Sequence, residues 1–141
     1  MASPEAVKFL KQTPLFATFS GAELDATLRT AKERDFPSGA MIVKEGEKGS
    51  VGFYLVLSGQ VEVRKGKKSL GKFGAGDYFG EMSLLLDTPR TADVVALEKT
   101  RCLMLTRWDL RALISTHPDM ALKIQAELAK RLLNTNKALS E

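Results

Sequence analysis

Several residues in the middle of this 141-residue chain could together bind a phosphate group. Gly80 precedes a short run, residues 81–86, that we expect to be helical, and a glycine there lets the backbone approach a ligand closely. The amides of Met82 and Ser83, at the start of that run, are expected to be free to bind an anion. Arg90 follows a proline-fixed turn and can donate two parallel charge-assisted hydrogen bonds. This spacing predicts an anion site.

Glu81 adds a second requirement to that site. A carboxylate is a poor neighbour for a phosphate alone, but it fits a ligand that also presents a hydroxyl donor, such as a ribose 2′-OH. The segment does not match other phosphate motifs. It lacks the G-K-[ST] ending of a P-loop, and its glycines at 74, 76 and 80 miss the GxGxxG spacing of dinucleotide sites. We therefore expect a ligand that carries both a phosphate and a hydroxyl.

The run FGEMSL at residues 79–84, followed by PRTA at residues 89–92, closely resembles the phosphate-binding cassette of cyclic-nucleotide-binding domains. That family includes kinase regulatory subunits, catabolite-activator-type regulators and cyclic-nucleotide-gated channels. The resemblance extends over almost the whole chain. It implies a mainly β fold, an eight-stranded jelly-roll barrel with helices at both ends. It also implies that the ligand is cAMP or cGMP, with no other cofactor and no metal.

The same resemblance assigns roles to individual residues. It implies that Glu81 binds the ribose 2′-OH and that Arg90 binds the cyclic phosphate. The rest of the phosphate cradle would come from backbone groups and from the Thr91 hydroxyl. The ligand-binding residues implied within the cassette are Gly80, Glu81, Met82, Ser83, Arg90, Thr91 and Ala92. A structural alternative is an Arg–Glu surface pair beside a pocket that has lost its ligand.

Two further residues bear on the ligand. A hydroxyl residue at the position of Thr91 can bond both the phosphate and a syn guanine, but many cAMP receptors of this family also carry one, so we expect cAMP ahead of cGMP. Arg131 falls where some channel-type members place a basic residue over the purine, which makes it an additional ligand-binding residue. The alternative for Arg131 is a solvated side chain on an amphipathic helix.

The pattern along the chain predicts three zones in one domain, residues 1–141. Residues 1–33 are expected to form two helices, separated at Pro14, the second with a capping box at Ser20. Residues 34–106 are expected to form the strands, because short β-rich runs alternate with glycines. The predicted strands are 40–43, 52–57, 60–64, 70–73, 92–97 and 101–106.

Residues 107–140 are expected to return to helix. Thr106 caps a short helix, and His117-Pro118 starts a longer one whose apolar stripe must pack to be stable. The members of this stripe are Met120, Ile124, Leu128 and Leu132. We also expect Trp108 to pack between helix and barrel, and Cys102 to lie in the core.

Composition excludes several classes of protein. A single cysteine rules out an internal disulfide, and with a single histidine it cannot supply a usual zinc ligand set. No apolar run approaches the ~20 residues of a membrane span, and the N-terminus lacks the apolar core of a signal peptide. A cytoplasmic location is the expectation. The net charge of +4 favours anionic ligands without indicating nucleic acid.

These observations favour a cyclic-nucleotide receptor that repositions its C-terminal helix to signal. No Ser–His–Asp or paired-carboxylate arrangement suggests an enzyme. One alternative is the sensor half of a DNA-binding regulator, whose helix-turn-helix would begin where this chain ends, at Glu141. Another is a non-binding structural or dimerisation module on the same fold. A protein effector and a homodimer both stay open as partners, whereas we expect no nucleic acid to bind through this domain.

Overall fold

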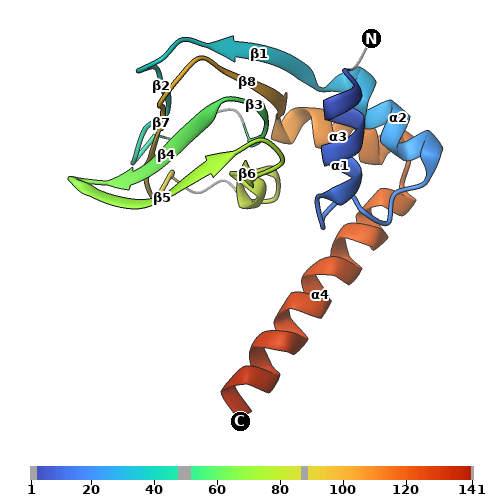
Figure 1. Ribbon diagram of the computed structural model, residues 1–141. Helices are drawn as coiled ribbons and strands as arrows, with labels where there is room; N and C mark the ends of the chain where they lie inside the picture. Colours follow the sequence, from blue (N-terminus) through green and yellow to red (C-terminus); the bar gives the residue numbers. More distant parts are fainter. Residues whose placement is uncertain (1–2, 48–51, 87–88, 141) are drawn as a thin grey trace.

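A β-barrel built from two sheets lies beside a group of helices, and one long helix projects away from both (Figure 1). The computed structural model describes residues 3–47, 52–86 and 89–140. Its elements in chain order are α1 (Pro4–Gln12), α2 (Gly21–Thr30), β1 (Lys32–Phe36), β2 (Met41–Val43), β3 (Phe53–Ser58), β4 (Gln60–Lys65), β5 (Lys68–Gly74), β6 (Tyr78–Phe79), the 3₁₀ turn η1 (Glu81–Leu84), β7 (Asp93–Ala96), β8 (Thr100–Leu105), α3 (Arg107–Thr116) and α4 (Asp119–Ser140).

The eight strands form two antiparallel sheets of four. One sheet has the order β1-β8-β3-β6 and the other has the order β2-β7-β4-β5. Apolar side chains from the two sheets meet in the barrel core, which contains Phe36, Ile42, Val43, Tyr54, Val56, Val61, Val94, Ala96 and Cys102. The predicted fold, an eight-stranded barrel with helices at both ends, is therefore confirmed, as is the core position of Cys102.

Each of the six predicted strands overlaps an observed strand, but β1 and β6 are absent from the prediction. The helical zone was expected to reach residue 33, whereas β1 already begins at Lys32. Four of the five residues of β1 are charged, so its sequence lacks the apolar alternation of a strand. Its charges are compensated across the strand pair, because Arg101 on β8 binds both Glu33 and Asp35. β6 has only two residues, too few to show any period.

Three predicted signals lie at boundaries of the short helices. The predicted capping box is present at the start of α2, where Ser20 and Glu23 exchange hydrogen bonds. Thr106 caps α3 in the same way, with Asp109 as its partner. α1 ends directly before Pro14 in the sequence, with Thr13 as its C-cap. These capped helices pack against β3 and β8, in a second core that extends from α1 to α4.

Two packing expectations for the C-terminal helices are wrong. Trp108 is 62% exposed, because α3 turns Leu110 and Leu113 into the core instead. The guanidinium groups of Arg107 and Arg111 lie over the indole ring of Trp108.

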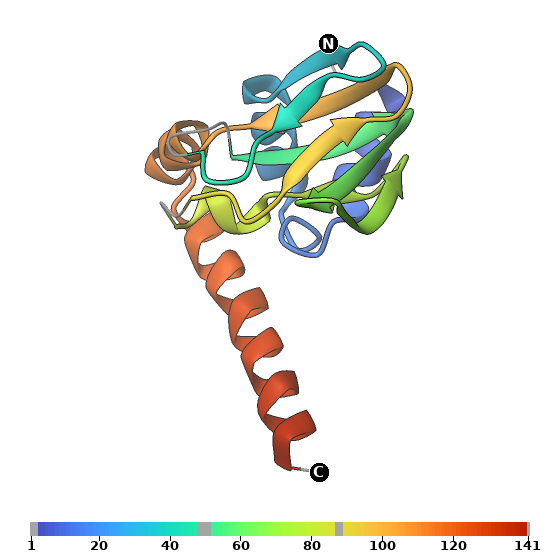
Figure 2. The same cartoon turned by 90° about the vertical axis from the view of Figure 1, so that its left-hand side faces the viewer.

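The apolar stripe of α4 is buried only at its first members. Met120 and Ile124 are buried and Leu128 is partly buried, but Leu132 is 62% exposed. Figures 1 and 2 show the reason: the later turns of α4 extend beyond the barrel and the other helices. Within the described residues, no helix is both long and apolar enough to cross a membrane.

Candidate functional site

A pocket of about 450 Å³ opens between the β6–η1 segment and the chain that enters β7. This volume lies within the range of roughly 300–1,000 Å³ that is common for small-molecule sites. Its lining comes from both sheets and from η1: Val43, Val63, Phe73, Tyr78, Phe79, Gly80, Glu81, Met82, Ser83, Pro89, Arg90, Thr91, Ala92 and Val94.

Gly80 allows two parts of the pocket wall to come into close contact. Its φ angle is +78°, a left-handed conformation that favours glycine. A Cβ atom at this position would lie 2.5 Å from the carbonyl oxygen of Gly52 and 2.6 Å from Nη1 of Arg90. Only glycine therefore lets η1 start directly against the guanidinium of Arg90.

Arg90 is the buried cation of the pocket, with 8% of its surface exposed. Its Nη2 donates to the carbonyl oxygen of Gly52 at 2.8 Å, and its backbone is bonded to residues 46 and 47. Burial lowers the pKa of the Arg90 guanidinium, and the nearby Tyr54 and Glu47 act in the opposite direction. Holding a guanidinium at this depth costs solvation, and an anionic ligand would offset that cost.

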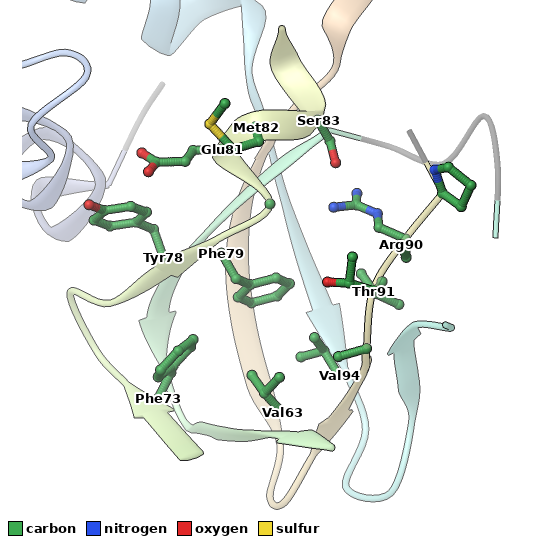
Figure 3. Close-up of a pocket in the computed structure, with 14 residues that line it drawn as sticks. Val63, Phe73, Tyr78, Phe79, Glu81, Met82, Ser83, Arg90, Thr91 and Val94 are labelled. Carbon is green, nitrogen blue, oxygen red and sulfur yellow. The ribbon is translucent and has the colours of Figure 1, made fainter. Parts of the chain in front are cut away.

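Two hydroxyl groups lie near that cation. Figure 3 shows the side chains of Ser83 and Thr91 directed toward the same part of the pocket as the Arg90 guanidinium. The backbone of Ser83 is less available than expected, because its N–H donates to the carbonyl oxygen of Gly80 at 3.0 Å within the 3₁₀ turn. The expectation of a free Ser83 amide is therefore wrong for this structure. The expected helix is also shorter, a single turn over residues 81–84.

Glu81 lies on the opposite side of the pocket from Arg90, beside Tyr78 (Figure 3). Its carboxylate accepts hydrogen bonds from Arg131 of α4, with Nη1 2.6 Å from Oε1 and Nη2 3.3 Å from Oε2. The hydrogen bond that Arg131 donates to Glu81 raises the pKa of the Arg131 guanidinium. Burial raises the pKa of Tyr78, and the negative charge of Glu81 adds to that effect.

Away from these polar groups, the pocket is apolar. Val63 and Phe73 come from β4 and β5, and Val94 comes from β7. Phe79 lies on the same side, with its ring stacked on Tyr54 at a centroid distance of 5.0 Å. The pocket thus offers a guanidinium and two hydroxyls at one end, a carboxylate at its rim and an apolar floor. Such a surface complements a ligand that combines an anionic group, a hydroxyl donor and a flat apolar body.

Comparison with known sequences identifies the family. A sequence profile described as "Cyclic nucleotide-binding domain" matches residues 33–117, which include all of the barrel except the first residue of β1 and the whole pocket. The chain belongs to the cyclic nucleotide-binding domain family.

Individual relatives are regulatory proteins. The chain is 38% identical to the cyclic AMP receptor protein of Thermus thermophilus, over 87% of this chain and 59% of that protein. It is 39% identical to a cAMP-dependent protein kinase regulatory subunit of Mycosarcoma maydis, over 66% of this chain and 18% of that protein. The chain therefore spans about three fifths of the first relative and less than a fifth of the second.

A solved structure shares the fold. The N-terminal domain of a transcriptional regulator from Streptomyces coelicolor A3(2) matches with a TM-score of 0.86 and 29% identity. The match covers 93% of this chain and 94% of that chain. The likeness to this domain thus extends to the helices on either side of the barrel.

The predicted site residues fall into two groups. The seven cassette residues all line the pocket: Gly80, Glu81, Met82, Ser83, Arg90, Thr91 and Ala92. Arg131 does not line it, but binds Glu81 at its rim. The cassette motif predicts no site role for the apolar floor, for example Val63 and Phe73, or for Tyr78. In the sequence these residues look like ordinary apolar residues of strands, and this pattern does not distinguish a pocket wall from a core.

Proposed function

We propose that this chain is a receptor domain for a cyclic nucleotide, with cAMP preferred over cGMP. Arg90 would bind the cyclic phosphate, helped by the hydroxyls of Ser83 and Thr91 and by backbone groups of Gly80, Met82 and Ala92. Glu81 would bind the ribose 2′-OH. The purine would lie on the apolar surface that includes Phe73.

The observation that carries this proposal is the buried Arg90 guanidinium in contact with Gly80, in a pocket whose rim holds Glu81. A cation kept at 8% exposure in a cavity of ligand size favours an anionic ligand. The carboxylate at the rim would be unfavourable for an anion without a hydroxyl donor, and a ribose supplies one. Both requirements are met by a cyclic ribose phosphate.

The preference for cAMP has support from the relatives. The Thermus thermophilus protein is named a cyclic AMP receptor, and the Mycosarcoma maydis protein is a regulatory subunit of a cAMP-dependent kinase. Thr91 would be compatible with either nucleotide. Calorimetric titration of the purified chain with cAMP, with cGMP and with 5′-AMP tests the proposal. We expect saturable binding of cAMP, weaker binding of cGMP and the weakest binding of 5′-AMP. Equal or absent binding of all three would overturn the proposed function.

We propose that the domain, residues 1–141, regulates another protein or module in the cytoplasm and catalyses no reaction itself. Among the residues that the structure describes, no three His, Cys, Asp or Glu side chains gather as a metal site would require. Chromatography after incubation with cAMP is expected to return the nucleotide unchanged. Formation of AMP that depends on Arg90 would contradict the receptor proposal.

A second candidate is the sensor half of a DNA-binding regulator. It is favoured by the likeness to the Streptomyces coelicolor domain, which is the N-terminal part of a transcriptional regulator. In that case DNA binding would belong to a different part of the protein. A gel-shift assay of this chain with cAMP and duplex DNA is expected to give no retarded band, and a band would show that this domain itself contacts DNA.

A further inference from the structure

The guanidinium of Arg131 is held along two of its edges. Its Nη1 and Nη2 donate to the two carboxylate oxygens of Glu81. Its Nε donates to Oε1 of Glu127 at 3.3 Å, one turn earlier on α4. A guanidinium is planar, so contacts on two edges fix the orientation of the whole group.

The two acceptors belong to different parts of the molecule. Glu81 comes from the cassette, whereas Glu127 and Arg131 lie on the same helix, four residues apart. All three side chains are partly buried. Without Glu127, only the contact with Glu81 would orient the guanidinium, which could then turn about that contact. Both oxygens of Glu81 accept from Arg131, and each keeps a second lone pair for a ligand hydroxyl, so the orientation of Arg131 decides which lone pairs stay available.

We propose that Glu127 is a positioning residue for the nucleotide site. It does not line the pocket, and it acts on the ligand through Arg131 by holding the guanidinium in the plane that leaves Glu81 able to accept a hydroxyl. This inference rests on the proposed function, since it concerns the carboxylate proposed to bind the ribose 2′-OH. A structural role is the competing explanation, because an (i, i+4) Glu–Arg pair also stabilises a helix.

The two explanations differ in their effect on ligand discrimination. The readout is the ratio of the affinities for cAMP and 2′-deoxy-cAMP, measured by calorimetry on the whole chain. Glu127→Ala is expected to lower this ratio about two- to fivefold, the range for one partly exposed charge pair. Glu127→Gln keeps an acceptor for the Nε–H group and is expected to retain most of the ratio. In an Arg131→Ala background, Glu127→Ala is expected to cause no further change in this ratio.

Gln125→Ala serves as the matched control, because Gln125 is an exposed side chain of similar size on the same helix. It is expected to leave the ratio unchanged, and circular dichroism verifies that every variant folds. An equal loss of affinity for both ligands, or an unchanged ratio in Glu127→Ala, would overturn the inference while the proposed function stands. The inference would also be overturned if Glu127→Ala lowered the ratio by the same factor in the Arg131→Ala background. A wild-type chain that binds neither ligand would overturn the proposed function and this inference with it.

Discussion

Arg131 of α4 and Glu81 of the cassette form an ion pair across 50 positions of the sequence, with Nη1 2.6 Å from Oε1. The pair joins the rim of the pocket to the last helix at the point where that helix leaves the body of the protein. Beyond Arg131, residues 132–136 are exposed. A ligand that engages Glu81 therefore acts on a contact between α4 and the cassette.

The first prediction concerns the ligand hydroxyl. Glu81→Ala is expected to weaken cAMP binding strongly and 2′-deoxy-cAMP binding much less, since the contact is already missing in the deoxy ligand. A cycle over the two proteins and the two ligands isolates the Glu81–hydroxyl contribution. Glu98→Ala is a useful comparison, because Glu98 is an exposed acidic residue that does not line the pocket. Equal losses for both ligands would mean that Glu81 does not bind the 2′-OH.

The second prediction concerns the phosphate. Arg90→Ala is expected to cost about 1.5–3 kcal/mol of binding free energy, or roughly ten- to a hundredfold in affinity for cAMP. Arg90→Lys keeps the charge but loses the two parallel donors, so an intermediate affinity is expected. The control is Arg29→Ala, whose side chain forms an exposed pair with Asp25. Calorimetry at one ionic strength makes the comparison, and an Arg90→Ala protein with wild-type affinity would remove the phosphate assignment.

The third prediction concerns Gly80. A methyl group there would collide with the Gly52 carbonyl and with Nη1 of Arg90, in a conformation that non-glycine residues rarely adopt. Gly80→Ala is therefore expected to displace Arg90, lower the free energy of unfolding by about 1–3 kcal/mol and reduce cAMP affinity. Gly21→Ala is the control, because a Cβ at Gly21 meets no atom within 4 Å. In denaturant titration and calorimetry, Gly21→Ala is expected to have nearly the wild-type free energy of unfolding and cAMP affinity. A Gly80→Ala protein with the same two values would contradict the steric account.

The sequence predicts some parts of this arrangement and not others, depending on how far apart in the chain the interacting residues lie. The cassette is readable because Gly80, Glu81 and Arg90 lie within one short segment, where spacing alone constrains geometry. The contact between Glu81 and Arg131 cannot be predicted in the same way, because it depends on how α4 leaves the body of the protein. Trp108 shows the same limit: its apolar character predicts burial, but the neighbouring Arg107 and Arg111 cover its ring at the surface.

The fourth prediction concerns a second ion pair of α4. Lys123 binds Glu23, a residue that is 5% exposed and whose carboxylate also closes the capping box of α2. The hydrogen bond from Lys123 lowers the pKa of Glu23 below its ordinary value of 4.5, followed by the backbone bond from Ser20. A lowered folded-state pKa means that this stabilisation is fully present above 4.5 and is lost as the pH falls through the folded value.

Glu23→Gln separates the charge from the cap, because glutamine also serves in a capping box. The variant is expected to lose about 0.5–1.5 kcal/mol of unfolding free energy near neutral pH. The difference from wild type is expected to shrink as the pH is lowered from neutral to below 4.5, because Glu23 itself takes up a proton as the pH falls through its folded-state pKa. Denaturant titrations across that range measure it. A difference that stays constant with pH would show that the charge of Glu23 contributes nothing.

The last prediction concerns the movement of α4. Nucleotide binding can shift a conformational equilibrium only if one conformation binds more tightly than the other. The Arg131–Glu81 pair supplies a candidate for that difference, because the ligand and α4 use the same carboxylate. The loop before α4, at His117-Pro118, could serve as a hinge, but the buried Met120 and Ile124 and the Lys123–Glu23 pair hold the first two turns of α4. We therefore expect the movement to lie beyond Ile124.

Two labels test this movement, one at Lys72 on the exposed edge of β5 and one at Asn134 on α4, each introduced as cysteine. Cys102 should stay unlabelled, since it is fully buried and burial raises its pKa to about 12. Saturating cAMP is expected to shorten the distance between the labels, as the far part of α4 closes toward the pocket. A control pair at Lys72 and Asp119 should not change, since the start of α4 is held in place. An unchanged distance between Lys72 and Asn134 at saturation would mean that the domain binds its ligand without moving α4. A changed distance between Lys72 and Asp119 would place the hinge at His117-Pro118.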